Sequence, residues 1–381
     1  MMAMGTSIIY PILPIIHHSL HVSEAQIGLV LSAFSFPAIF MAPLAGVFAD
    51  LRGRKWILTA GLLLYGVAGL CISITNSFTW LLILRAIQGV GYSGVMPLVV
   101  VLIGDNFSKE TETAAQGMKI FTDRIAELCL PPLAGLLAAV AWQMPFLLYG
   151  LAIPLAMGVL RCLPEPQMNR RTQTLFYLKD IFAIASQLRC LVIFSMSSLR
   201  FFLEYAFFTY LPMFALYTLG ITVTKGGFLF TIYAGAAMVT ASQIRPIVAR
   251  FERVNLVLLS FCVQGLCLLA IPAARSFWGL GLLLFFFGLA NGIISPTQKS
   301  LLTQSAPGEL RGGVVSADRV LQTISKTISP PIAGLILALS SVEAVFVTLG
   351  AIVLMWVLGT LLLQMRGYLK TAQAHQRRDM G

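Results

Sequence analysis

Charged residues are scarce in this sequence. They make up 11% of its 381 residues, whereas hydrophobic residues make up 58% and the mean hydropathy is +0.86. A soluble domain has about 25% charged and about 45–50% apolar residues. So small a charged fraction excludes an ordinary water-soluble fold and predicts a protein that lies in a membrane.

The chain also lacks the patterns that an enzyme or a metalloprotein needs. It has no nucleotide-binding loop, no set of nucleophile and base near one membrane face, and no residue cluster with metal-ligand spacing. Its six cysteines are isolated, in or beside apolar blocks, as small apolar residues are. A cleavable signal pattern is absent as well. We therefore expect no catalysis, no cofactor and no metal.

The apolar residues form blocks of roughly 18–28 residues, each long enough to cross a ~30 Å hydrocarbon core as a helix. The blocks lack the strict alternation of barrel strands, which are about 10 residues long. The sequence thus predicts an all-α integral membrane protein. Its twelve expected spans are residues 1–16, 25–48, 57–76, 79–103, 113–139, 143–162, 189–217, 225–248, 255–273, 276–302, 312–338 and 342–365. The first is shorter than a full crossing, which suggests that it is truncated.

Basic residues are distributed unequally between the two sides of these spans. One side, with the tail, holds nineteen lysines and arginines, whereas the opposite side holds only Lys225 and Arg275. Lysine and arginine in short loops mark the cytoplasmic side. We expect both termini in the cytoplasm and a location in the plasma (inner) membrane. The net charge of +11 is then an orientation signal and does not indicate a nucleic-acid partner.

The chain aligns with itself at a shift of 199 residues. Gly28 falls on Gly227 and Gly89 on Gly288. A denser match places Pro131, Pro132, Ala134 and Gly135 on Pro330, Pro331, Ala333 and Gly334. A repeat of six spans predicts two related six-helix bundles, with a substrate site near the midplane where they meet. The expected domains are residues 1–162, a cytoplasmic linker 163–188, residues 189–365 and a cytoplasmic tail 366–381.

The loop after the second span carries a motif that supports a family resemblance. It reads G-V-F-A-D-L-R-G-R-K, and its motif residues are Gly46, Asp50, Arg52, Gly53, Arg54 and Lys55. Gly46 permits close helix approach, and Gly53 allows a tight turn. The pattern resembles the G-x-x-x-D-x-x-G-R-[RK] signature of the major facilitator superfamily, as does R-x-x-Q-G-x-G at 85–91.

This resemblance covers the whole chain and points to the twelve-span drug/proton antiporter branch. It implies the twelve-helix fold of that superfamily and transport by alternating access, with the loop motif as a conformational latch. At the 199-residue shift Asp50 becomes Ala249 and Gly53 becomes Glu252, so a second latch would be built differently.

A proline pair in the fifth span permits two interpretations. Pro131, Pro132 and Gly135 weakly resemble the G-P-x-x-G-G motif of antiporters. The same residues recur in the eleventh span as Pro330, Pro331 and Gly334, where that motif is not usually found. A pair of symmetric helix kinks is the alternative.

Ionisable and amide side chains inside the spans are candidates for the substrate or proton pathway, because charge in a bilayer is costly. They are Arg85, Asp123, Glu127, Arg200, Glu204, Asn291 and Lys326. The alternative for Arg85 is a structural cation bound by backbone carbonyls. Arg200 and Glu204, four residues apart, form either a proton carrier with its partner or a static ion pair. Asn291 contacts either ligand or a neighbouring helix.

The remaining candidates occupy spans five and eleven, which are equivalent in the two halves of the repeat. Asp123 and Glu127 share a helix face, so one of them is expected to hold a proton. Lys326 occupies the position equivalent to Glu127 in the second half. Asp318 precedes Lys326 on a polar stripe of span eleven. This stripe either belongs to the transport site or packs against the second span.

The leading hypothesis is proton-coupled efflux of lipophilic or amphipathic compounds. The alternatives are a symporter that imports a polar or charged solute and, in another class, a membrane sensor that does not transport. The expected partners are the lipid bilayer, a small-molecule substrate and protons as the coupling ion, and we expect a monomer.

Overall fold

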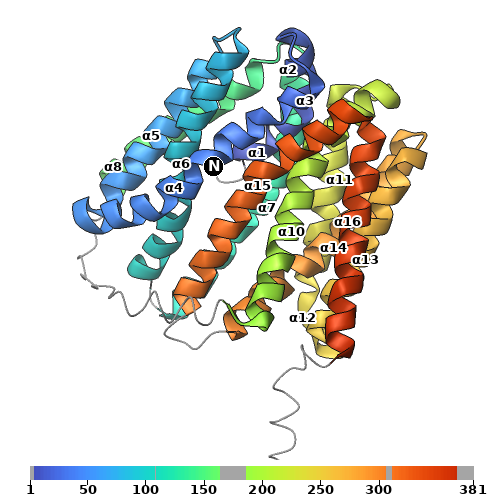
Figure 1. Cartoon of the computed structure of the whole chain (residues 1–381). Helices are drawn as coiled ribbons and strands as arrows, with labels where there is room; N and C mark the ends of the chain where they lie inside the picture. The colour runs from blue at the N-terminus through green and yellow to red at the C-terminus, as the bar shows by residue number, and fades with distance from the viewer. Residues whose placement is uncertain (1–3, 108, 164–185, 306–310, 367–381) are drawn as a thin grey trace, which may run out of the picture.

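The structure is a computed structural model that describes residues 4–107, 109–163, 186–305 and 311–366, all of whose regular elements are helices (Figure 1). The first half contains α1 (Met4–Ser7), η1 (Tyr10–Ile12), α2 (Leu13–Ser19), α3 (Glu24–Ile27), α4 (Leu29–Arg52), α5 (Arg54–Ile72), α6 (Phe78–Asn106), α7 (Lys109–Ala138), η2 (Met144–Leu151) and α8 (Ala152–Cys162). The second half contains α10 (Leu188–Met213), η3 (Phe214–Thr218), α11 (Val223–Ser242), α12 (Ile244–Arg250), α13 (Arg253–Ala270), η4 (Ile271–Ala273), α14 (Phe277–Gln304), α15 (Arg311–Leu339) and α16 (Val342–Met365).

These elements form the twelve spans of two six-helix bundles, in the order that the apolar blocks predict. Eight helices of the described chain are long and apolar enough to cross a membrane, or nine if the bent pair α11 and α12 counts as one span. Two spans that do not meet this test, α7 and α15, carry charged residues along their length. The charges of these two spans thus lie on helices and not in the loops between them.

The first span departs from the single helix expected over residues 1–16. It consists of three short pieces, α1, η1 and α2, which run from Met4 to Ser19. Pro11 and Pro14 lie within it. A proline has no backbone N–H to donate and its ring clashes with the preceding turn, which explains why one regular helix does not form here.

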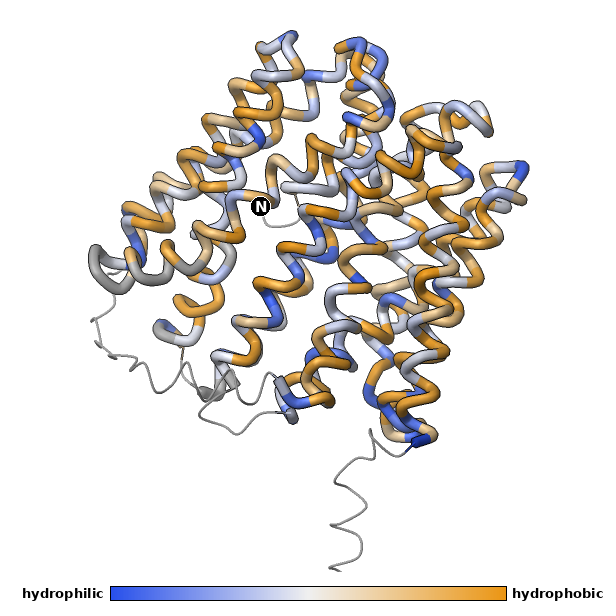
Figure 2. The backbone as a smooth tube through the Cα atoms, viewed as in Figure 1, coloured by the Kyte–Doolittle hydropathy of each residue, from blue (hydrophilic) through white to orange (hydrophobic). Residues whose placement is uncertain are grey.

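The repeat appears in the contacts between helices. In the first half α4 packs on α6, α5 on α6 and α5 on α8. At the 199-residue shift the equivalent pairs are α11 with α14, α13 with α14 and α13 with α16, and all three are in contact. Most residues of these helices are apolar, and hydrophilic residues gather at the helix ends and along α15 (Figure 2).

Two equivalent seams join the bundles at the end predicted to be external. In the first seam α15 packs against α3 and α4, and in the second α7 packs against α11. The first seam holds a hydrogen bond from Ser32 Oγ to the Thr327 carbonyl of 2.6 Å. The second holds its counterpart, from Thr231 Oγ1 to the Leu128 carbonyl, of 2.9 Å. Figure 1 shows α4 and α15 crossing near the top and separating toward the bottom.

Glycines permit this close approach in both seams. A β-carbon on Gly28 would lie 2.8 Å from the carbonyl oxygen of Pro330, and one on Gly227 would lie 2.6 Å from that of Pro131. Gly334 and Gly135 face the opposite helix just as closely. The proline pairs therefore lie in the seams. Whether they also kink their helices stays a prediction.

The loop between α4 and α5 contains the tight turn expected of Gly53. Its φ of 97° lies in the region that favours glycine, and it joins the two helices with no other residue between them.

Substituting the seam glycine Gly227 with alanine is expected to destabilise the protein. The added methyl group meets backbone atoms of α7, which cannot turn away as a side chain can, so the free energy of unfolding should fall by about 1–3 kcal/mol. Thermal unfolding of the purified protein measures this loss.

Gly226→Ala is the matched control, because a β-carbon there has nothing within 4 Å. We expect it to change stability by about 0.5 kcal/mol or less. Equal effects of the two substitutions would contradict the close packing of the second seam.

Candidate functional site

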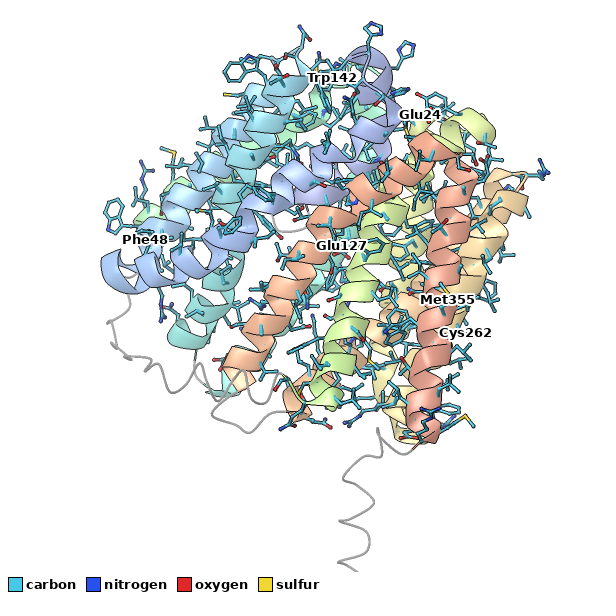
Figure 3. The ribbon with its side chains drawn as sticks, in the orientation of Figure 1. Glu24, Phe48, Glu127, Trp142, Cys262 and Met355 are labelled. Atoms are coloured by element: carbon cyan, nitrogen blue, oxygen red, sulfur yellow. The ribbon has the colours of Figure 1, made fainter. Side chains whose placement is uncertain are left out.

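The polar candidates lie on helices that meet in the interior. Arg200 and Glu204 come from α10, Asn291 from α14, Glu127 from α7 and Lys326 from α15. Figure 3 shows Glu127 at about mid-height of the molecule, well below the end at which Glu24 lies. Glu127 is therefore at the depth where a substrate site between two bundles is expected.

A chain of hydrogen bonds leads to the carboxylate of Glu204. The hydroxyl group of Tyr233, on α11, donates to Glu204 Oε1 at 2.7 Å. Asn291 Nδ2 donates to the same hydroxyl oxygen at 2.5 Å. Asn291 is buried. The amide group of Asn291 and the phenol group of Tyr233 therefore fix the position of Glu204 from the neighbouring helices.

The expected pair of Arg200 and Glu204 is present but loose. Arg200 Nη2 lies 3.9 Å from Glu204 Oε2, and the two side chains are 10% and 20% exposed. The Arg200 guanidinium carbon lies 4.4 Å from the centre of the Phe201 ring. Arg200 and Phe201 are both within a helical turn of Glu204, so all three of these residues come from α10.

Lys326, on α15, contacts two aromatic rings of α10. Its Nζ lies 4.1 Å from the centre of the Phe201 ring and 5.7 Å from that of Tyr205. Glu127, its counterpart in the repeat, is not bonded to it among the described side chains. The structure thus brings Arg200, Glu204 and Lys326 into one group around Phe201.

The two acids of α7 are each paired with a base on their own helix. Asp123 accepts from Lys119 at 2.9 Å, and Glu127 accepts from Arg124 at 2.5 Å. The four side chains are between 20% and 35% exposed. Each acid thus has a cation of its own helix that offsets the repulsion expected between two acids four residues apart. Whether one of them holds a proton stays a prediction.

The polar stripe of α15 faces α10 and not the second span, which was its alternative. Gln322 donates to Ser197 Oγ of α10 at 3.0 Å and to Asp318 Oδ2 at 2.6 Å. The second span contacts α15 through Ser32 and the Thr327 carbonyl. The stripe is thus part of the interface between the seventh and eleventh spans.

Arg85 lies apart from this group and is fully buried in the first bundle. Its guanidinium donates to the carbonyl of Gly5 at 2.8 Å, to that of Val30 at 3.4 Å and to Gln88 Oε1 at 2.7 Å. It also lies over the Phe34 ring, 4.4 Å from its centre. These are the contacts of the structural alternative, so we do not place Arg85 in the site.

An aromatic group connects the first span to the second bundle. Tyr10 stacks on Phe230 with ring centres 5.7 Å apart and an angle of 10° between the rings. It also meets Phe208 and Tyr205 at 5.4 and 6.3 Å. This packing places an apolar wall next to Glu204, whose partner Tyr233 contacts Phe208.

Tyr233 is the residue that the sequence did not indicate. It is an aromatic residue in an apolar span, and its counterpart at the 199-residue shift is Phe34. No local pattern marks a tyrosine whose hydroxyl group bonds an acid on another helix. The one signal in the sequence is the hydroxyl group of Tyr233 in a largely apolar block, which would have suggested that it bonds a polar partner.

The latch motif falls partly outside the described residues. Gly46, Asp50 and Arg52 belong to α4 by their backbone but lie outside the residues whose surroundings are described, and Arg54 and Lys55 begin α5. Its function as a conformational latch stays a prediction. Within the described ranges, no three His, Cys, Asp or Glu side chains could hold a metal ion.

The family model of the Major Facilitator Superfamily matches residues 1–325 and 193–378 of this chain. The chain is 26% identical over 360 residues to the bacillibactin exporter of Bacillus subtilis, covering 87% of this chain and 86% of that protein. It is 22% identical over 363 residues to the quinolone resistance protein NorA of Staphylococcus aureus, covering 91% and 90%.

The fold is similar to that of a solved transporter. A bacterial homolog of the human lysosomal transporter Spinster, in an inward-facing and occupied conformation, superimposes with a TM-score of 0.80. The match covers 96% of this chain and 94% of that one at 14% identity, so it supports the fold alone.

Arg85→Lys is expected to destabilise the protein without removing its charge. A lysine ammonium cannot reproduce the planar guanidinium that reaches two backbone carbonyls and Gln88 at once. We expect the free energy of unfolding to fall by about 1–3 kcal/mol. Thermal unfolding in detergent measures the change.

Arg161→Lys, at an exposed position in the last turn of α8, is the control and should be nearly neutral. If R85K kept full stability and lost transport, Arg85 would belong to the transport pathway after all.

Proposed function

The chain belongs to the major facilitator superfamily, and on that premise we propose that it exports small amphipathic compounds by alternating access, coupled to protons. The two seams close the end predicted to be external, and the group around Phe201 lies beneath them. In this proposal the bundles rock so that the seams part and the opposite end closes.

The observation that supports proton coupling is the environment of Glu204. The two acids of α7, Asp123 and Glu127, are held by short ion pairs with cations of their own helix. Glu204 has a longer contact, 3.9 Å, with Arg200. A carboxyl group that is largely buried and only loosely paired is better suited to exchange a proton than one in a tight pair.

The relatives support the direction of transport. One of them is named an exporter and another a resistance protein. Their names say what those proteins do, and we infer efflux for this chain from that likeness and from the resemblance of its motifs. The aromatic rings next to Glu204 suit a compound with an apolar body.

A second candidate is a symporter that imports a charged solute together with a proton. It is favoured by Lys326, which has no carboxylate partner among the described side chains. The two candidates differ in the direction of proton movement relative to the substrate. A receptor that does not transport would show no substrate-dependent flux.

Glu204→Gln is expected to abolish substrate-driven proton flux. Glutamine still accepts the hydrogen bond from Tyr233 but holds no transferable proton. The measurement uses proteoliposomes with a trapped pH dye, an imposed pH gradient, and a panel of anionic, neutral and cationic amphipathic compounds.

Glu127→Gln is the comparison variant and should keep the flux. If E127Q lost the flux and E204Q kept it, the proton carrier would lie on α7. Proton movement in the same direction as the substrate would support the symporter.

A further inference from the structure

Lys326 is a cation without a counter-ion. Its ammonium group can donate three hydrogen bonds, yet its contacts in the structure are the faces of Phe201 and Tyr205, and no acid lies in ion-pair distance among the described side chains. A cation–π contact compensates only part of the cost of a lysine within the hydrocarbon region. Lys326 therefore has unused capacity for an anion.

The nearby carboxylates do not supply that anion. Glu204 accepts from Tyr233 and contacts Arg200, Glu127 is bonded to Arg124, and Asp123 to Lys119. With these three acids ionised, each has a cation on its own helix, and relative to these pairs Lys326 is one positive charge in excess. A fourth acid, Asp318, is buried eight residues before Lys326 on α15 and accepts from Gln322.

Arg200 provides a second, independent sign of a missing anion. The residue is 9% exposed as a whole, and its buried Nε has no hydrogen-bond partner. Its guanidinium carbon and Lys326 Nζ lie 4.4 and 4.1 Å from the centre of the same Phe201 ring. Two cations around one ring repel each other, and a buried donor without a partner costs free energy.

An apolar surface adjoins the two cations. Phe201 and Tyr205 are half-buried, and Tyr205 leads on to Tyr10 of the first span. A ligand that pairs with Lys326 would thus find aromatic rings from both bundles beside its charged group.

We infer that the transported compound is an amphipathic anion, such as an aromatic carboxylate or sulfonate. Its anionic group pairs with Lys326, near Arg200, and its apolar body lies on Phe201 and Tyr205. The inference rests on the proposed function in treating this group as the transport site, but not on the direction of transport. An amphipathic cation would meet a group with one uncompensated positive charge and is disfavoured.

The test compares three compounds with one ring system and different charge: naphthalenesulfonate, naphthylmethanol and naphthylmethylammonium. Their binding to the full-length protein in nanodiscs of zwitterionic lipid is measured by calorimetry, with empty nanodiscs subtracted. We expect the sulfonate to bind at least about tenfold more tightly than the neutral alcohol, the ratio typical of one charge-assisted hydrogen bond. The ammonium compound should bind most weakly.

Lys326→Gln should reduce sulfonate binding to the level of the alcohol, and Lys326→Arg should keep most of it. Arg319→Gln is the matched control, since Arg319 is an exposed cation seven residues earlier on the same helix. It should leave all three affinities unchanged. Thermal unfolding shows whether each variant is folded, and the comparison of the three compounds on the unsubstituted protein does not depend on any variant.

Equal binding of the three compounds, preference for the ammonium, no binding of the sulfonate, or unchanged sulfonate binding in K326Q would overturn the inference. Counterflow of the same compounds in proteoliposomes distinguishes a failure of this inference from a failure of the proposed function. Transport of the ammonium but not of the sulfonate would reject the anion and keep the transporter. Sulfonate binding without transport of any compound would keep the anion site and reject the transporter.

Discussion

A charge inside a membrane must be compensated, because it costs about 2.5–3.5 kcal/mol at a helix centre even on insertion scales. This constraint determines how the interior of the protein is arranged. Arg85 is bound by the carbonyls of two other helical segments, and the α7 acids by cations one turn away. Glu204 and Lys326 are compensated less completely, by a long ion pair and by aromatic faces. The incomplete compensation is what distinguishes the candidate site from the structural charges.

The fold was largely predictable from the sequence, because span length and repetition are properties of the chain itself. Apolar blocks predicted the order of the twelve spans and, for α16, the bounds 342–365 as well, whereas α4 begins and ends four residues later than expected. The match of Gly28 with Gly227 indicated the repeat, and in the structure both glycines pack against a proline carbonyl. The broken first span was not predicted, because an apolar block of this length is typical of one helix and Pro11 and Pro14 interrupt it.

The site was predictable only in part, because contacts between helices depend on their rotation and tilt. Residues on one helix, such as Arg200 and Glu204, could be paired from their spacing. The bond from Tyr233 to Glu204 could not, since 29 residues and a turn of the chain separate them. The same reason explains why a charge in a span, as in Arg85, did not reveal by itself whether it belonged to the site.

The excess charge of Lys326 also determines how membrane voltage would act on the transporter. A voltage of 100 mV contributes about 2.3 kcal/mol for each elementary charge that crosses it. With Glu204 ionised, the group of Arg200, Glu204 and Lys326 has a net charge of +1 when empty and zero with a bound monoanion. In the proposed export the return step takes place with Glu204 protonated and no compound bound, so the group then has a charge of +2. The voltage would thus act on the return step and leave the loaded site unaffected. A negative interior would draw the protonated site toward the cytoplasm after each release outside.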